Sequence, residues 1–137
     1  MRLFIAINFD ENTKENLITV QNHLRKLGRG NFSRPENLHL TLAFLGEVSP
    51  ERVAEICRIM DQITVPVLHI SFDHVGRFKR DGGDIWWIGL AKNKTLLTLQ
   101  KELAERLRAE GFPIENRSFS PHVTLARRVV LNEKQEN

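Results

Sequence analysis

Residues 39–43 read His-Leu-Thr-Leu-Ala, and residues 122–126 read His-Val-Thr-Leu-Ala. This short internal repeat is the feature of the sequence that most constrains the fold. Each copy lies in an apolar run typical of a β-strand, over residues 38–45 and 122–130. Side chains alternate along a strand, so each His shares a face with the Thr two residues later. We therefore expect two strands that each present an imidazole beside a hydroxyl on one face.

The same alternation assigns the intervening apolar residues to the opposite face, where they would pack against helices. In the first copy these residues are Leu40, Leu42 and Phe44, and in the second they are Val123 and Leu125. One face of each strand is thus predicted to build the core while the other carries chemistry.

Further strands and helices alternate along the rest of the chain. Strands are expected over 2–9, 67–75 and 85–91, with a turn around Asp81-Gly82-Gly83 between the last two. A first helix is capped by Asp10 and ends near Gly28, and a third runs from about Lys94 to Glu110. The second helix begins at Ser49-Pro50 and ends before Pro66. Its apolar stripe consists of Val53, Ile56, Cys57 and Met60.

Composition indicates an ordinary globular protein and excludes disordered, collagen-like and disulfide-scaffold proteins. The 137 residues are enough for one domain, and 41% are hydrophobic, 27% charged. The net charge of +3 is compatible with a nucleic-acid partner without requiring one. The single cysteine, Cys57, excludes an internal disulfide, fits a cytoplasmic location and is expected to be a small buried hydrophobe. The apolar run at 3–7 is too short for a signal peptide, and no segment of the sequence could span a membrane, so no membrane partner is expected.

Two paired His and Thr side chains suit acid–base chemistry on a phosphate ester. Imidazole has an unperturbed pKa of about 6.5, so one histidine can accept a proton while another donates one. The threonine hydroxyls can donate hydrogen bonds to an anionic oxygen held between them. This arrangement favours phosphodiester cleavage without a metal. A metal site is disfavoured because no carboxylate or third histidine lies at ligand spacing around either His39 or His122.

These motifs resemble the two His-x-Thr/Ser motifs of the 2H phosphoesterase superfamily. The similarity is closest to its RNA 2′,3′-cyclic phosphodiesterases, also called 2′-5′ RNA ligases, and spans roughly residues 2–128. It is carried by RLFIAI at 2–7, ENLHLTLAFLGEV at 36–48, IWWIGL at 85–90 and NRSFSPHVTLAR at 116–127. The resemblance implies an α+β, bilobal fold. Two antiparallel sheets, backed by helices, would surround a central cleft with pseudo-twofold symmetry.

The resemblance also implies roles for five residues. His39 and His122 match the catalytic histidines, and Thr41 and Thr124 match the hydroxyls that contact the phosphate. Arg127 matches a basic residue that serves the phosphate. Because Arg127 lies five residues after His122, regular alternation would turn it away from the cleft. A bulge, a twist or the end of the strand would have to bring it round; otherwise it is a solvated charge at the strand end.

The activity implied is hydrolysis of RNA ending in a 2′,3′-cyclic phosphate to a 2′-phosphate. His122 would activate water and His39 would protonate the departing 3′ oxygen, although the symmetry of the motifs leaves these roles exchangeable. Reversal with a 5′-hydroxyl would form a 2′-5′ bond without any nucleotide cofactor. Two other functions stay open from the residues alone: a non-catalytic RNA-binding module, and a cyclic phosphodiesterase that acts on a small nucleotide.

Two aromatic residues are candidates for stacking on a base. Trp86, Ile88 and Leu90 share the expected core face of their strand, so Trp87 points to the other face. Phe4 is placed in the same way, opposite its apolar neighbours in the first strand. Base stacking on an aromatic ring contributes about 1–3 kcal/mol. A packing role for Phe4 and Trp87 remains the alternative.

We expect one domain over residues 1–137, made of two lobes. Relatives of this type continue beyond the second motif, whereas this sequence closes with LNEKQEN at 131–137. The C-terminal lobe is therefore expected to be short of strands and to expose a sheet edge. We expect this edge either to pair with a second copy, which gives a homodimer, or to make the isolated chain poorly soluble. A truncated sequence and a smaller lobe that is stable alone are the competing explanations.

Overall fold

Two antiparallel sheets form the framework of the computed structural model, which describes residues 1–116 and 118–132. The smaller sheet pairs β1 (Arg2–Asn8) with β3 (His39–Glu47). The larger has the order β2-β6-β5-β4. Its strands are β2 (Gly28–Phe32), β6 (His122–Leu131), β5 (Asp84–Leu90) and β4 (Phe72–Phe78). The expected α+β architecture of two antiparallel sheets is confirmed, while Arg117 and the end of the LNEKQEN tail, 133–137, lie outside the described residues.

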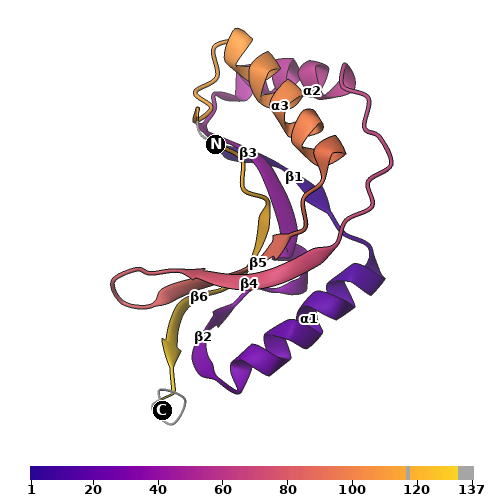
Figure 1. Ribbon diagram of the computed structural model, residues 1–137. Helices are drawn as coiled ribbons and strands as arrows, with labels where there is room; N and C mark the ends of the chain where they lie inside the picture. The colour runs from indigo at the N-terminus through magenta and orange to yellow at the C-terminus, as the bar shows by residue number, and fades with distance from the viewer. Residues whose placement is uncertain (117, 133–137) are drawn as a thin grey trace.

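Each sheet is backed by its own helical layer (Figure 1). Helix α1 (Glu11–Arg25) lies against β2 and β6 of the larger sheet, although it follows β1 in the chain. Helix α3 (Lys94–Ala109) lies against β3 of the smaller sheet, and α2 (Val53–Asp61) packs on α3. Short 3₁₀ turns precede β3 and α2, at Pro35–Asn37 and Pro50–Arg52.

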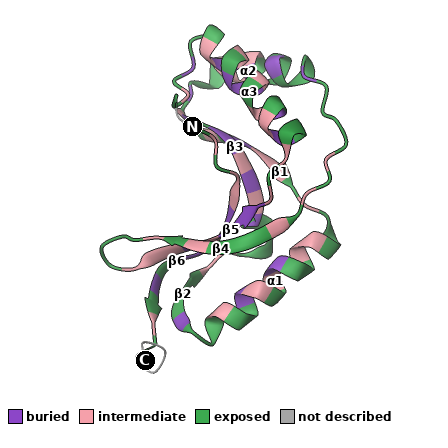
Figure 2. Cartoon of the chain, in the orientation of Figure 1, coloured by how far each residue is buried: buried purple, intermediate pink, exposed green. Residues whose placement is uncertain are grey.

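One hydrophobic core joins the two sheets. Its centre contains Leu40 of β3 and Leu125 of β6, both fully buried, and these two strands contact each other. Leu17 of α1 and Leu96 of α3 reach the same core from opposite sides. Figure 2 marks the buried residues in purple along both sheets and the helices. Because complete burial of each leucine contributes about 1.5–3 kcal/mol, this shared core holds the two sheets together.

Sequence and structure agree at the start of α1 but differ at its end. The carboxylate of Asp10 accepts a hydrogen bond from the Thr13 amide at 2.8 Å, as predicted for a helix cap. Gly28, however, does not end the helix; it opens β2 and pairs with Leu131. A Cβ on Gly28 would lie 2.8 Å from the Val130 carbonyl oxygen, so this glycine is required by the close approach of β2 to β6.

The predicted stripe of the second helix is wrong at two positions. Cys57 and Met60 are exposed, whereas Ile56 and Ile59 are buried. The buried face continues to Ile63 just beyond α2, a spacing of three and four residues. The helix is therefore rotated about its axis relative to the prediction, with Ile59 and Ile63 facing the core in place of Cys57 and Met60. This orientation is favoured because the branched aliphatic side chains bury more apolar area.

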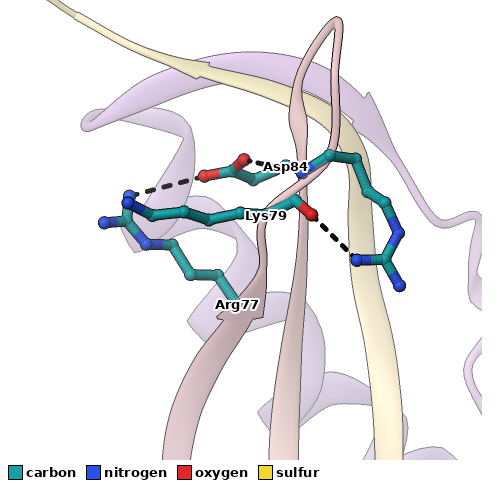
Figure 3. Close-up of polar contacts among 4 residues, drawn as sticks. Arg77, Lys79 and Asp84 are labelled. Atoms are coloured by element: carbon teal, nitrogen blue, oxygen red, sulfur yellow. Dashed lines mark hydrogen bonds and ion pairs between the residues drawn. The ribbon is translucent and has the colours of Figure 1, made fainter.

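The predicted strand at 67–75 also begins later and ends later than expected. Val67 lies 81% exposed, and pairing with β5 starts at Phe72 and continues to Phe78. The turn that follows is organised by Asp84, which accepts from the Arg80 amide at 3.3 Å and contacts the Arg77 guanidinium at 3.4 Å (Figure 3). This turn fixes the β4–β5 hairpin beside the strand that carries His122.

Candidate active site

Each His-x-Thr strand contains a β-bulge at the same position of the motif. In the smaller sheet, Thr41 pairs with Ala6 and Ala43 pairs with Ile5, which leaves Leu42 as an extra residue. In the larger sheet, Thr124 pairs with Trp87 and Ala126 pairs with Trp86, which leaves Leu125 extra. The repeated Leu-Ala pair of the sequence is therefore the site of a repeated irregularity in the strands.

A glutamine from the helix behind each sheet bonds to the carbonyl of the extra residue. Gln100 of α3 donates its side-chain N–H to the Leu42 carbonyl at 3.1 Å. Gln21 of α1, which is buried, donates to the Leu125 carbonyl at 3.0 Å and to the Ser33 carbonyl at 2.9 Å. The Leu125 carbonyl also accepts from the Ser33 amide at 2.9 Å, so the glutamine adds a second donor there, while Gln100 supplies a donor to the Leu42 carbonyl.

Because of the bulges, the residues that follow them point to the face opposite to the one that regular alternation predicts. Phe44 was expected in the core, but its side chain is 68% exposed and pairs directly with Phe4. Ala126 stays on the core face with Trp86, so Arg127, the next residue, lies on the opposite face, the face of His122. The bulge that Arg127 required is thus present, and Phe44 occupies the corresponding position in the first motif.

His39 lies half-buried under an aromatic ring on the small sheet. The ring of Phe4 stacks on it with centroids 5.0 Å apart and an interplanar angle of 24°. Burial first, and then the positive charge of Lys14 on α1, lower the pKa of His39 from its ordinary 6.5. Phe4 is itself 48% exposed, and its stacking on His39 places it on the His face, as alternation predicts.

His122 is held by the backbone and by a layer of rings. Its Nδ1 contacts the Ser120 carbonyl oxygen at 2.8 Å, and because a carbonyl can only accept, Nδ1 carries a proton. In the neutral ring Nε2 is then the free acceptor. Trp87 and Phe78 place their ring centroids 5.8 Å and 5.5 Å from that of His122. Trp87 therefore lies beside this histidine, as alternation predicted.

The two threonines complete the pair of units. Thr41 and Thr124 are half-buried and lie two residues after their histidines on strands without a bulge between them, so each shares its histidine's face. The backbone of Thr124 is anchored by the Ser33 hydroxyl, which donates to its carbonyl oxygen at 3.0 Å. β3 and β6 contact each other, so the two strands that carry the His-x-Thr units meet at the junction of the two sheets.

Two surface hollows lie away from this junction. One hollow, of about 310 Å³, lies between helix α3 and the segment that follows α2. Its lining residues include Thr64, Lys94 and Glu102. One of about 480 Å³ lies at the β4–β5 turn, beside Lys79 and Asp84. No described residue that lines either hollow is a histidine or belongs to the repeated motifs, so the candidate site is the face that carries those motifs. Among the described residues no group of three or more His, Cys, Asp or Glu could hold a metal ion. No helix there is long and apolar enough to cross a bilayer.

Three features were not found from the sequence: the Lys14 neighbour of His39, the two glutamines, and the exposure of Phe44. Lys14 and Gln21 lie on α1, whose pairing with the larger sheet is a tertiary property. The five-residue offset from His122 to Arg127 was the one local signal of a bulge, and it applied equally to the first motif.

Paired His-x-Thr units on two helix-backed antiparallel sheets define a 2H phosphoesterase. The family model described as LigT like Phosphoesterase matches residues 7–87 and 88–136. The chain belongs to this LigT-like phosphoesterase family.

Named relatives and solved structures agree with that assignment. An RNA 2′,3′-cyclic phosphodiesterase of Archaeoglobus fulgidus is 34% identical over 93% of this chain and 72% of its own length. One from Escherichia coli is 32% identical over 92% of this chain and 71% of its own. The crystal structure of E. coli LigT complexed with 3′-AMP has a TM-score of 0.78 and 32% identity, and covers 93% of this chain and 72% of that one.

Proposed function

We propose that this chain hydrolyses RNA 2′,3′-cyclic phosphate ends to 2′-phosphates by two-histidine acid–base catalysis. The observation that carries the proposal is the repeated unit of His, Thr and bulge on two strands in contact at the junction of the sheets. The relatives named as RNA 2′,3′-cyclic phosphodiesterases, which match nearly the whole chain, supply the substrate class.

His122 is proposed as the base and His39 as the acid. The Ser120 carbonyl keeps the proton of His122 on Nδ1, so Nε2 can take a proton from water as its oxygen attacks phosphorus. The lowered pKa of His39 makes its protonated form a stronger acid. His39 gives that proton to the 3′ oxygen as the phosphorus–O3′ bond breaks. The products are a 2′-phosphate and a free 3′-hydroxyl.

Thr41, Thr124 and Arg127 are proposed to hold the phosphate. Their positions on the histidine faces support this role, because hydroxyl donors and a guanidinium can neutralise charge that develops on the non-bridging oxygens. No cofactor is needed for these steps. The reverse reaction, in which a 5′-hydroxyl attacks the cyclic phosphate, would form a 2′-5′ linkage with the same two proton transfers.

Phe4 and Trp87 are proposed to contact bases. Phe4 is better suited to stacking, because about half of its surface is open and its other side already covers His39. Trp87 is enclosed by neighbouring rings, with Phe78 at 5.3 Å and His122 at 5.8 Å between centroids. Its contact with a base is therefore proposed to be through the edge of the indole and not through its face.

Self-association and cellular location complete the proposal. In the described chain β2 and β4 are the end strands of the larger sheet, and the exposed Val75 lies on β4. We propose that such an edge pairs two copies into a homodimer. A cytoplasmic location is proposed from the single, unpaired Cys57.

The test is incubation of the protein, in EDTA, with a short RNA that ends in a 2′,3′-cyclic phosphate. We expect conversion to a 2′-phosphate, lost in both His39→Ala and His122→Ala, while His23→Ala, an exposed histidine on α1, retains it. Turnover of a mononucleotide 2′,3′-cyclic phosphate but not of the RNA would assign the site to a small nucleotide. Binding of the RNA without conversion would identify a non-catalytic binding module instead.

A further inference from the structure

A third histidine, His74, lies on the same face of the larger sheet as His122. In β4, Phe72 pairs with Leu90 and His74 pairs with Gly89, which leaves Asp73 as the extra residue of a bulge. Neighbouring side chains on a regular strand point to opposite faces and cannot meet. The bulge removes that restriction, and the Asp73 carboxylate contacts Nδ1 of His74.

Gly89 allows the His74 ring to lie across the sheet. A Cβ on Gly89 would overlap Cε1 and Nε2 of His74, so this edge of the imidazole covers the glycine. Gly89 pairs on its other side with His122. His74, Gly89 and His122 therefore form a row across three strands, with the two outer strands about 10 Å apart.

The ring of Trp87 supports His74 in this position. The two ring planes meet edge to face at 89°, with centroids 5.4 Å apart. Trp87 itself lies over Gly76, where a Cβ would overlap the indole. Two glycines thus make room for a continuous layer of rings that runs from His122 to His74.

We propose that His74 binds the sugar–phosphate backbone of the second-to-last nucleotide, the one that precedes the terminal nucleotide with its cyclic phosphate. The proposal rests on the proposed function and names how that site would recognise RNA beyond the reacting nucleotide. Strand order places β3, β6, β5 and β4 in sequence from His39 to His74. A strand of RNA that extends from the histidine pair across β5 meets His74 next, whereas a mononucleotide has no preceding backbone to reach it.

The Asp73 carboxylate determines which atom of His74 is offered. Since a carboxylate accepts, Nδ1 carries a proton, and Nε2, at the ring edge over Gly89, is the remaining nitrogen that can bond to a substrate. Nε2 accepts from a ribose 2′-hydroxyl when the ring is neutral, and donates to a phosphate oxygen when the ring is protonated. Both partners are oxygens of the preceding nucleotide's backbone. His74 and Asp73 side chains are 56% and 53% exposed, so substitution there leaves the core intact.

The test compares binding and turnover for one-nucleotide and two-nucleotide ligands. Affinities are measured by calorimetry for a mononucleotide 2′-phosphate and a dinucleotide 2′-phosphate, and kcat and KM for the matching 2′,3′-cyclic phosphates. The variants are His74→Ala and Asp73→Asn, with His69→Ala as the control because His69 is an exposed histidine before β4.

We expect His74→Ala to weaken dinucleotide binding and raise its KM about tenfold, as for one lost hydrogen bond to a polar group. Mononucleotide constants and the His69→Ala control should stay unchanged, and Asp73→Asn should give a smaller loss on the dinucleotide alone. If the partner is the ribose hydroxyl, a 2′-deoxyribose in the preceding nucleotide should abolish the difference in affinity between the wild type and His74→Ala. If the partner is the phosphate, a methylphosphonate linkage should abolish that difference.

Equal losses for both ligand lengths, or no loss for either, would overturn the role of His74. These outcomes are separate from failure of the proposed function, in which the wild-type protein converts neither cyclic phosphate. In that case the inference still stands or falls on the affinity difference between the two 2′-phosphates.

Discussion

His39 and His122 show how two copies of one motif acquire different chemistry. Both are followed by the same threonine, leucine and alanine spacing. Burial, and then the positive charge of Lys14, lower the pKa of His39. His122 instead donates from Nδ1 to a backbone carbonyl. The difference comes from neighbours outside the motif, so the motif alone could not assign acid and base.

Lys14→Gln tests the assignment of His39 as the acid. An acid must be protonated, so activity falls as pH rises through the pKa of His39. Removing the positive charge of Lys14 raises that pKa toward its ordinary value, and the alkaline limb of the kcat profile should move to higher pH. The profile is measured on a mononucleotide cyclic phosphate, with the exposed Lys26→Gln as the control. Movement of the acidic limb instead would make His39 the base.

Arg127→Gln tests whether the bulge delivers a guanidinium to the phosphate. We expect kcat/KM to fall about 10²-fold, the loss typical of one donor to developing negative charge. Arg128→Gln is the matched control, because it removes the same charge from the adjacent exposed residue. Arg128 has a different backbone conformation from its neighbours, left-handed with φ 54°. Equal effects of the two variants would show a general effect of charge and not a contact made by Arg127.

At the scale of the strand, the bulges are the elements that place the site. Each inserts one leucine, turns the next exposed side chain to the histidine face, and is bonded to a helix glutamine. The bulge on β4 similarly brings Asp73 to His74. A regular two-residue alternation would have kept Phe44 in the core and Arg127 away from the site.

Gln21→Leu tests the support of the second bulge. The Ser33 carbonyl would lose its Gln21 donor, and the Leu125 carbonyl would keep only the Ser33 amide, so the free energy of unfolding should fall by about 1–3 kcal/mol in urea titrations. Gln100→Leu should cost less, because its bond to Leu42 is only partly buried. The order of the two losses is the result to examine, and a larger loss for Gln100→Leu would contradict this reading of the bulges.

Sequence patterns predicted most elements because local chemistry determines them. The Asp10 cap, the apolar spacing of α3 and the alternation of β5 are all readable without tertiary information. β2 was missed because Gly28–Phe32 contains two glycines and no apolar alternation; it forms only because β6 offers an edge. Helix α2 was misaligned because nine residues allow two competing stripes.

At the scale of the whole molecule, the two sheets depend on one core, and their outer strands face solvent. Sedimentation over a range of concentrations tests the proposed homodimer, which we expect to dissociate on dilution. Val75→Lys on β4 should shift the equilibrium toward monomer, because a charge on an edge strand disfavours pairing. An unchanged monomer at every concentration would contradict the proposal.

The two neighbouring tryptophans of β5 also give the molecule two natural optical reporters. The sequence has two tryptophans and no tyrosine, so its ultraviolet emission comes almost wholly from Trp86 and Trp87. Trp86 is enclosed with Ala126 and Val129, while Trp87 lies in the ring layer beside His122. Trp87→Phe would leave a fluorophore that follows unfolding, and Trp86→Phe one that follows occupation of the histidine face. Folding and ligand binding can thus be read separately from adjacent residues of one strand, without attaching a dye.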